Sequence, residues 1–560
     1  MKKIFFMASV ILLFLLTMFL FTNIKSETTQ EGNSSQEDYV PNEVLVKFKS
    51  DVSKYVIQEA VHYLQGKIIN YLGNELSPFA WDSADFSLRS FRLDPYLLHI
   101  RVPETIGTNQ AIDILNQSPY VEYAEKNGIY HACKVPNDQF CNNPTNFQYG
   151  LGRIKAYDAW DITTGRTDIV VAVIDSGIDM IHEDLKDYDQ YQDKFRIWKN
   201  EDEIPGNGID DDNNGYKDDY RGWNFVSNNN NIADDDEFTS HGTHNAGIIG
   251  AWTNNGIGIA GVDWKAKIMV LKGLDNNTNI KASSVINAID YATENGAHIS
   301  NNSYAKANEQ QYSTGAAIAR AMNAGRLFIA AAGNKRQLDW RDNDIKPVYP
   351  ASHDIDNVIS VAYTSCFIDE LNSNSHYGFY SVDLAAPGEQ IYSTWKNNNY
   401  DYLDGTSEAA PFVAGVAALI WANRPNLSWW QVKTIIMKSV DQLSSLSGKV
   451  QSGGRLNAYK ALTIPTPNLP TAPSNLNAQA FGCDVKLTWT DNSNNENGFE
   501  IYRKNGDIFV MIDTTGPNMT AYWDIDLIPY ETWCYYVRAY NQDGNSPKSL
   551  SKCAKTGPCQ

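Results

Sequence analysis

Residues 168–177, DIVVAVIDSG, form an apolar and mostly β-branched run that ends in a carboxylate and a glycine. A short continuous apolar run of this kind is typical of a buried strand in a parallel sheet. Ser176 and Gly177 then supply a turn. The sequence therefore predicts an α/β fold in which a central strand delivers Asp175 at its carboxyl end. Read alone, Asp175 could also be a simple turn former.

Two later segments each carry a second reactive side chain. Residues 241–244, HGTH, open a segment rich in Ala, Gly and Ile, whose small side chains allow a helix to lie close to a sheet. Residues 405–411, GTSEAAP, place Ser407 before another small-residue helix, so its hydroxyl would lie at the positive end of that helix. Read singly, His241 could be a core or helix-start histidine, and Ser407 an N-cap.

Taken together, Asp175, His241 and Ser407 suit nucleophilic catalysis. A serine hydroxyl needs an imidazole to accept its proton and a carboxylate to hold that imidazole in the right tautomer. The chain order Asp, His, Ser suits only some of the folds that use this chemistry. With their surrounding motifs, the three residues resemble the subtilisin-like serine proteases. The resemblance implies a parallel sheet flanked by helices and a peptide-hydrolysing site.

A fourth segment extends the resemblance. Residues 327–334, LFIAAAGN, are similar to the family's strand that carries the oxyanion-hole asparagine. The resemblance implies that the side-chain amide of Asn334 donates to the oxyanion of the reaction intermediate. The backbone N–H of Ser407 would be the second donor.

The resemblance also implies substrate-binding segments, although some of their residues differ from those usual in the family. Residues 301–305, NNSYA, look like the strand to which an extended peptide adds, but Tyr304-Ala305 stands where the family usually has Leu-Gly. Residues 348–350, VYP, resemble the floor of the primary specificity pocket, where Val in place of the frequent Gly implies a shallower pocket. The opposite edge, 279–281, lacks the family's glycine. The expected substrate-binding residues are Ser303, Tyr304, Ala305, Ala331, Gly333 and Val348.

One residue beside the nucleophile also departs from the family. Glu408 follows Ser407, where the family usually has Met. A carboxylate at this position would lie near the developing oxyanion and near His241.

The 560 residues are expected to form several domains. Lys2-Lys3 and an apolar run to Phe21 predict a signal peptide, or alternatively a retained membrane anchor. The expected parts are a signal peptide at 1–26, an inhibitory propeptide at 38–132, a subtilisin-like catalytic domain at 133–462, a Pro-rich linker at 463–473, and a fibronectin type III-like β-sandwich at 474–558. The propeptide and the sandwich are assigned from their resemblance to known domains. For residues 38–132, an unrelated α/β domain is the alternative. Processing is expected between Tyr130 and Lys134.

The net charge is −20, and about half of it comes from residues 201–237, which hold twelve acids and only two bases. Within that stretch, oxygen-bearing side chains alternate around Gly215 with EF-hand-like spacing, although Arg221 stands where a bidentate Glu is needed. Dense carboxylates repel one another unless a cation compensates. A structural calcium site is predicted, with a solvated acidic loop as the alternative. Its expected ligands are Asp210, Asp212, Asn214, Tyr216, Asp218 and Asp219.

A second calcium site is implied by the family resemblance alone. Its ligands would be the side chains of Asp184 and Asn255 with the carbonyls of Ile257 and Ile259. Strong acidity also argues against a nucleic-acid partner, which needs a basic surface.

Seven cysteines in an exported chain favour disulfides, with one thiol left over. Cys133 and Cys141 are close enough in sequence to pair. Cys534 and Cys553 would lie opposite each other if a hairpin turns near Gly544. Cys366 is the expected free thiol, although sequence does not settle the connectivity.

The sequence thus predicts a secreted, calcium-stabilised serine endopeptidase made as a zymogen. Its expected partners are peptide or protein substrates and its own propeptide as inhibitor, and a membrane only if the N-terminal segment is retained. An inactive relative that acts as a surface-binding protein is the main alternative. A metal hydrolase using His241 and His244 is a weaker one, because no Glu lies between the two histidines to act as base.

Overall fold

A computed structural model describes residues 39–69, 75–77, 91, 94–128, 134–141, 147–187, 196–236, 239–277, 279–307, 309–335, 340–506 and 508–559. The chain divides into two compact units, 1–132 and 133–560. The expected signal peptide, the processing region before Lys134, and Cys133 lie outside the described residues. No helix within the described ranges is both long and apolar enough to cross a bilayer.

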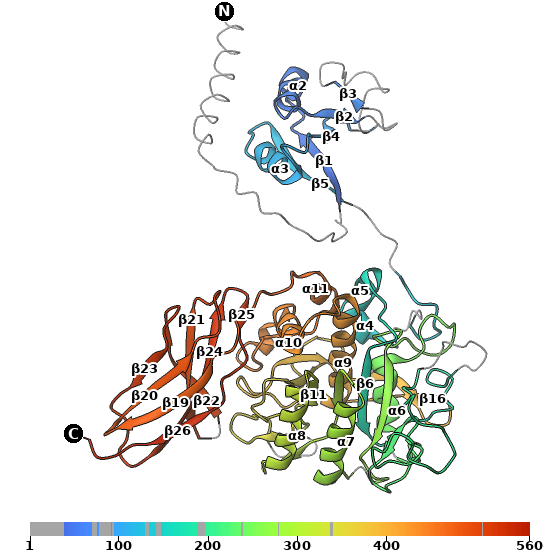
Figure 1. Cartoon of the computed structure of the whole chain (residues 1–560). Coiled ribbons are helices and arrows are strands. Elements are labelled where there is room, and N and C mark those ends of the chain that lie inside the picture. Colours follow the sequence, from blue (N-terminus) through green and yellow to red (C-terminus); the bar gives the residue numbers. More distant parts are fainter. Residues whose placement is uncertain are drawn as a thin grey trace, which may run out of the picture. The chain divides into compact units, whose positions relative to one another are not determined.

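The first unit is a small α/β domain (Figure 1). Its elements are β1 (Tyr39–Phe48), α2 (Lys54–Tyr63), β2 (Lys67–Ile69), β3 (Glu75–Leu76), β4 (Leu97–Arg101), α3 (Thr108–Asn116) and β5 (Val121–Gly128). The strands form one antiparallel sheet in the order β3-β2-β4-β1-β5. Alternate residues of β1, such as Val44 and Val46, are fully buried against both helices, so the strand's alternating pattern accounts for the core.

The second unit is built on a nine-stranded sheet in the order β17-β18-β14-β13-β11-β9-β6-β8-β7. Every neighbouring pair is parallel except β17 with β18. Its strands are β6 (Val170–Asp175), β7 (Gly222–Asn224), β8 (Lys267–Lys272), β9 (Ile299–Asn302), β11 (Leu327–Ala331), β13 (Val358–Thr364), β14 (Leu384–Pro387), β17 (Asp441–Gln442) and β18 (Gly454–Arg455). Two short pairs stand apart from it: β10 (Lys306–Ala307) with β12 (Val348–Tyr349), and β15 (Ile391–Trp395) with β16 (Asn399–Leu403).

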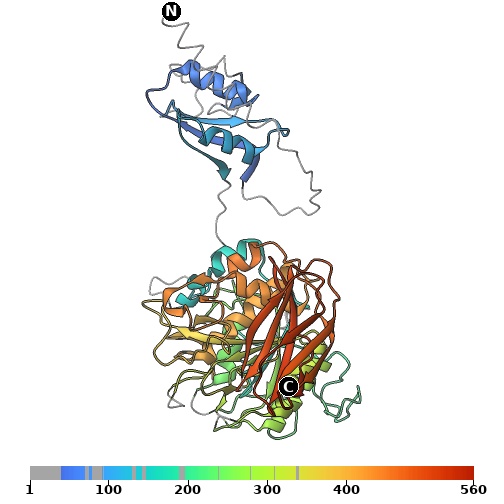
Figure 2. The same cartoon turned by 90° about the vertical axis from the view of Figure 1, so that its left-hand side faces the viewer.

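Helices cover both faces of the parallel sheet (Figures 1 and 2). They are α4 (Tyr149–Arg153), α5 (Ala156–Ile162), α6 (His241–Gly250), α7 (Ala282–Glu294), α8 (Tyr312–Asn323), α9 (Thr406–Asn423), α10 (Trp429–Lys438), the 3₁₀ turn η3 (Ser444–Leu446) and α11 (Ala458–Thr463). The side chains of β6 alternate between the two faces of the sheet. Val171 and Val173 pack toward α6 and α9, while Ala172 and Ile174 pack toward α7 and α8. A capping box starts α10, where Ser428 and Gln431 exchange hydrogen bonds.

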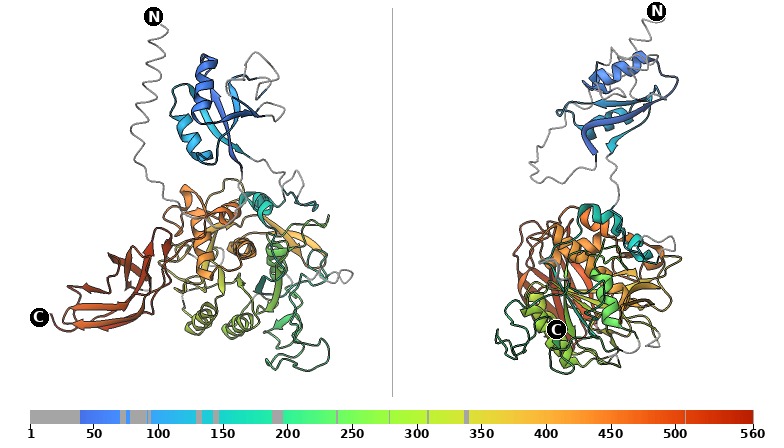
Figure 3. Two further views of the ribbon diagram at one scale, coloured as in Figure 1. Left: turned by 45° about the horizontal axis from the view of Figure 1, so that its top comes forward. Right: turned by 90° about the vertical axis from the view of Figure 1, so that its right-hand side faces the viewer.

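The C-terminal part of this unit is all β (Figure 3). Its strands are β19 (Ser474–Phe481), β20 (Asp484–Thr490), β21 (Gly498–Asn505), β22 (Ile508–Thr515), β23 (Ala521–Asp524), β24 (Thr532–Asn541), β25 (Gly544–Asn545) and β26 (Lys552–Lys555). Sheet β19-β20-β23 and the sheet around β21 and β24 enclose a core that includes Trp489, Phe499 and Tyr535. The expected fold class, a subtilisin-like α/β domain followed by an all-β sandwich, is confirmed.

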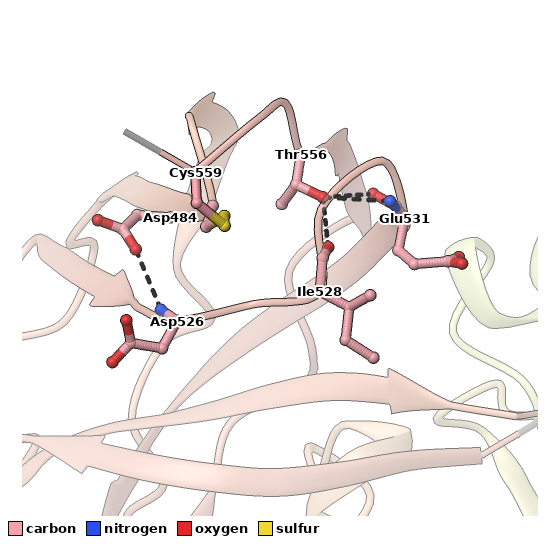
Figure 4. The surroundings of a disulfide bond; sticks show 7 residues. Asp484, Asp526, Ile528, Glu531, Thr556 and Cys559 are labelled. Atoms are coloured by element: carbon pink, nitrogen blue, oxygen red, sulfur yellow. Dashed lines mark hydrogen bonds between the residues drawn. A yellow bond between two sulfur atoms is a disulfide. The ribbon is translucent and has the colours of Figure 1, made fainter.

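The cysteines follow the predicted pairing only in part. Cys534 and Cys553 form a disulfide between β24 and β26, as predicted, and Cys366 is free. The prediction for Cys141 is wrong: it is a buried free thiol that lies 3.3 Å from the Tyr157 hydroxyl. A second disulfide, between Cys483 and Cys559, was not anticipated, because it joins the two ends of the sandwich sequence. Figure 4 shows how it ties down the C-terminal segment beside the Thr556–Ile528 hydrogen bond.

Candidate active site

A cavity of about 570 Å³ lies at the carboxyl ends of the central strands, between the β9–β10 segment and the start of α9. Of the predicted catalytic residues, His241, Asn334 and Ser407 line it, and Asp175 lies fully buried behind His241. Residues separated by more than two hundred positions are thus brought to one place by the parallel topology.

Asp175 and His241 form a close pair. The Nδ1 atom of His241 lies 2.8 Å from Oδ1 and 3.0 Å from Oδ2 of Asp175. The same carboxylate accepts hydrogen bonds from the backbone N–H of Ser176 and the side-chain amide of Asn245. These donors compensate the burial of the carboxylate and fix its plane, so Nε2 of His241 is left to face the cavity. Asn245 was not singled out from the sequence, although it lies one helical turn after His241.

Ser407 is the second residue of α9, in the first turn, where the backbone N–H groups lack partners within the helix. Its hydroxyl donates to the carbonyl of Ser303 at 3.1 Å. No hydrogen bond joins Ser407 to His241 within the described residues. In unliganded sites such bonds are often unformed, and a turn of the serine side chain toward His241 would make this one.

The Asn334 side chain is oriented by its neighbour Thr406. Its Oδ1 accepts from the backbone N–H of Thr406 at 3.0 Å and from the Thr406 hydroxyl at 3.2 Å. Since the carbonyl end of the amide is used in this way, the Nδ2 end remains available to donate to a group bound in the cavity.

The predicted substrate-binding residues lie at the cavity with one exception. Ser303, Tyr304, Ala305, Ala331 and Gly333 line it. Val348 does not line it: this side chain is fully buried and packs behind Gly333, where a Cβ would lie 3.2 Å from Cγ1 of Val348. The following residues Tyr349, Pro350 and His353 form the cavity wall instead.

Charges around His241 change its titration. Burial disfavours the imidazolium, but the Asp175 carboxylate and its hydrogen bond, with a further contribution from Glu408, raise the pKa of His241 to about 9. Burial raises the pKa of Glu408 to about 7, against the opposing effect of His241. Glu408 is 2% exposed. Each group thus favours the charged form of the other.

His244 does not share a site with His241. Its Nε2 lies 3.0 Å from the carbonyl of Ile391, and burial lowers its pKa to about 3. The two histidines point to different partners, so this geometry does not support the metal-hydrolase alternative.

The acidic loop brings together a smaller set of ligands than predicted. Carboxylate oxygens of Glu203, Asp212 and Asp219 lie within 4.8 Å of one another. Asn214 donates to both Asp212 and Asp219. Burial raises the pKa of Glu203, and both neighbouring acids add to the rise. One oxygen of Glu203 is buried without a hydrogen-bond partner, which is what a bound cation would satisfy.

Three residues predicted as ligands lie outside this cluster. Asp210 accepts the backbone N–H groups of Asn214 and Gly215, and Asp218 accepts those of Asn207 and Gly208. The Tyr216 ring packs edge-on to Trp223, Phe225 and Tyr291. The side chains of Asp210 and Asp218 thus serve backbone donors of their own loop, and the EF-hand-like ligand set stays a prediction. Glu203 was missed because it lies outside the alternating pattern.

The two side chains predicted for the second calcium site lie together. Asp184 accepts from the Asn255 side-chain amide at 3.0 Å, from the Ile259 N–H at 2.8 Å and from the Tyr400 hydroxyl at 2.8 Å. The Asn255 carbonyl oxygen is itself occupied by the N–H of Ile257. Burial raises the pKa of Asp184 to about 7. Hydrogen-bond donors thus hold this carboxyl, and the second calcium site stays a prediction.

Comparisons with known proteins agree with this fold. The Peptidase_S8 model of the subtilase family matches residues 166–467. Thermophilic serine proteinase of Bacillus sp. (strain AK1) is 32% identical over 440 residues, covering 78% of this chain and 92% of that protein. Thermitase of Thermoactinomyces vulgaris is 34% identical, over 59% of this chain and 99% of its own length. Subtilisin-like protease 1 of Plasmodium vivax is 36% identical, and the match spans about half (52%) of that protein.

The matched region contains the strand, the two helix starts and the asparagine that meet at the cavity. The chain therefore belongs to the subtilase family.

Proposed function

We propose that this protein is a serine endopeptidase that hydrolyses peptide bonds of peptide or protein substrates through an acyl-enzyme. The observation that carries the proposal is the Asp175–His241 pair beside Ser407 and Asn334 at one cavity. Membership of the subtilase family supports the same reaction.

Each residue has a role in this reaction. The Ser407 hydroxyl turns from the Ser303 carbonyl toward His241, loses its proton to Nε2, and its oxygen attacks the scissile carbonyl. Asn334 and the backbone N–H of Ser407 donate to the oxyanion. The peptide C–N bond breaks when His241 returns the proton to the leaving amine, and water then releases the acyl group by the same steps. Asp175 keeps the imidazole oriented throughout.

The rest of the chain is assigned as follows in this proposal. Residues 1–26 direct secretion, 38–132 act as an inhibitory propeptide, 133–462 are the catalytic domain, 463–473 the linker and 474–558 a fibronectin type III-like domain. The small α/β unit at 39–128 supports the propeptide assignment by its architecture. A secreted zymogen of this kind would become active when the propeptide is cut away.

Calcium is assigned to the carboxylates of Glu203, Asp212 and Asp219. Hard oxygen ligands suit this ion, and the unpartnered oxygen of Glu203 supports a cation there. Its role would be structural, since it relieves the repulsion of three buried or half-buried acids.

The proposed reaction is tested by Asp175→Asn. An amide in place of the carboxylate favours the wrong imidazole tautomer, and kcat for casein or a peptide substrate should fall by about 10⁴-fold. Asp168→Asn changes an exposed acid just before the same strand and should leave kcat unchanged. A full-rate Asp175→Asn enzyme would disprove the proposed triad.

Processing is expected to be autocatalytic, because the propeptide and the nucleophile belong to one chain and meet at high effective concentration. Ser407→Ala should therefore accumulate as an uncut precursor, seen as a larger band on electrophoresis. Normal cutting of this variant between Tyr130 and Lys134 in a protease-free host would contradict autocatalytic processing by Ser407.

Removal of calcium should lower the melting temperature, since a ligand that binds only the folded state at a hundredfold excess over its Kd stabilises it by about 2.7 kcal/mol. Glu203→Gln should lose much of this response, and Glu201→Gln, an exposed acid of the same loop, should retain it. In chelator, the contribution of Glu203 and Asp219 to stability should decrease as pH rises from ~4, because both acids hold protons more tightly when folded. An unchanged melting temperature in chelator would indicate a solvated loop.

Glu408→Met should move the acid limb of the kcat profile to lower pH, because the active form needs neutral His241 and the Glu408 charge raises the pKa of that histidine. Turnover should also rise above pH 7, where ionised Glu408 repels the oxyanion by up to about 3 kcal/mol at ~6 Å. Glu408→Gln should do the same, whereas only the Met variant should become sensitive to peroxide. Unchanged profiles in both variants would mean that the carboxyl points away from the reaction.

A further inference from the structure

The segment between β12 and β13 reaches from the active-site cavity to the C-terminal sandwich. At one end Tyr349, Pro350 and His353 line the cavity wall. At the other end Asp354 and Asp356 contact the sandwich through Lys548. We refer to residues 348–358 as the wall segment.

Lys548 holds both acids of the wall segment. Its backbone N–H donates to Oδ2 of Asp356 at 2.7 Å, and its ammonium lies 3.5 Å from Oδ1 of the same residue. The ammonium also forms a hydrogen-bonded ion pair with Asp354. Only 16% of the Lys548 side chain is exposed. Without this cation two carboxylates two residues apart would face each other, and like charges repel.

The part of the sandwich that carries Lys548 is itself fixed. Ser549 exchanges hydrogen bonds with Val537 of β24, at 2.9 Å through its N–H and at 3.0 Å through its Oγ. The Lys548 ammonium lies 5.0 Å from the ring centre of Tyr536, which is stacked on Tyr502 at 4.6 Å. The contact therefore comes from a connection between β25 and β26 that is fixed to β24.

Consecutive hydrogen-bonded turns of the wall segment connect the Lys548 contact to the cavity. The N–H of Ser352 donates to the Val348 carbonyl at 2.8 Å, and that of His353 to Pro350 at 3.0 Å. The N–H of Ile355 then donates to His353 at 2.8 Å. A displacement at Asp354 or Asp356 would therefore move His353 and Pro350 as well.

The sandwich has a separate attachment that does not involve the wall segment. The Lys438 ammonium at the end of α10 donates to the carbonyl of Gln542 at 3.1 Å. Gly544 packs so closely there that a Cβ would lie 3.0 Å from Leu469 and 3.5 Å from Thr434. The backbone N–H of the linker residue Asn468 donates to Oδ2 of Asp543 at 2.9 Å. Docking of the sandwich thus has its own contacts, apart from those of Lys548.

We propose that the sandwich acts as a support for the substrate site: Lys548 positions the wall segment, and so sets which substrate side chains the cavity accepts. Lys548 is a positioning residue that touches no substrate. The proposal rests on the proposed peptidase function, since it assigns part of the specificity of that site to a residue outside the catalytic domain.

The test compares three forms of the processed enzyme that retain the sandwich: the wild type, Lys548→Met and Lys438→Met. Methionine keeps an apolar stem of similar length but removes the cation. Lys438→Met is the matched control, because it removes a cation from the other attachment. Substrates are peptides that differ only in the side chain before the scissile bond, from Ala through Leu to Phe.

For Lys548→Met we expect KM for the bulkiest substrate to rise about tenfold, with kcat for the Ala substrate changed less than twofold. Asp356→Asn should act in the same direction. Lys438→Met should leave the ratio of kcat/KM between Phe and Ala substrates unchanged. Equal ratios in wild type and Lys548→Met, or the same loss for every substrate in both lysine variants, would overturn the proposal.

Hydrogen exchange provides a second readout that does not require activity. The amides of Ser352, His353 and Ile355 should exchange at least about tenfold faster in Lys548→Met than in wild type or Lys438→Met, because a broken contact frees the segment to open locally. Unchanged exchange there would reject the positioning role even if the wild type cleaved no peptide. A wild type without activity but with the expected exchange would reject the peptidase function alone.

Discussion

The buried carboxylate of Asp175 is the constraint on which the rest of the site depends. A charge without exposure to water requires donors, and three groups provide them: the His241 imidazole, the Ser176 N–H and the Asn245 amide. Ser176 is the next residue in the chain, but His241 and Asn245 can reach the carboxylate only because α6 packs very close to the end of β6. A Cβ on Gly242 would lie 2.2 Å from the Gly177 carbonyl oxygen, so the approach needs glycine at that point.

The sequence was most informative where function and local structure coincide. The apolar run before Asp175 predicted a parallel strand, and the small residues after His241 and Ser407 predicted helices packed on it. Each of these signals lies within about ten residues, and the parallel topology then brings the ends of the strands together. The fold class and the meeting of the catalytic candidates at one cavity could therefore be expected before the structure.

What the sequence did not predict depends on contacts between distant segments. Glu203 joins Asp212 and Asp219 only because the loop folds back, while Asp210 and Asp218 turn to backbone donors of their own loop. Val348 was expected in the pocket, but the left-handed Gly333 lies between it and the cavity. The Cys483–Cys559 disulfide joins residues 76 positions apart. No local pattern reports such pairings.

The central claim is that Ser407 is the nucleophile served by His241 and Asp175. Its most direct test is to treat the processed enzyme with a serine-directed fluorophosphonate and to locate the adduct by peptide mass mapping. The account predicts one adduct, on Ser407, that forms in step with the loss of peptide hydrolysis and is absent from His241→Ala. An adduct on another serine, or hydrolysis that persists after Ser407 is fully modified, would contradict it.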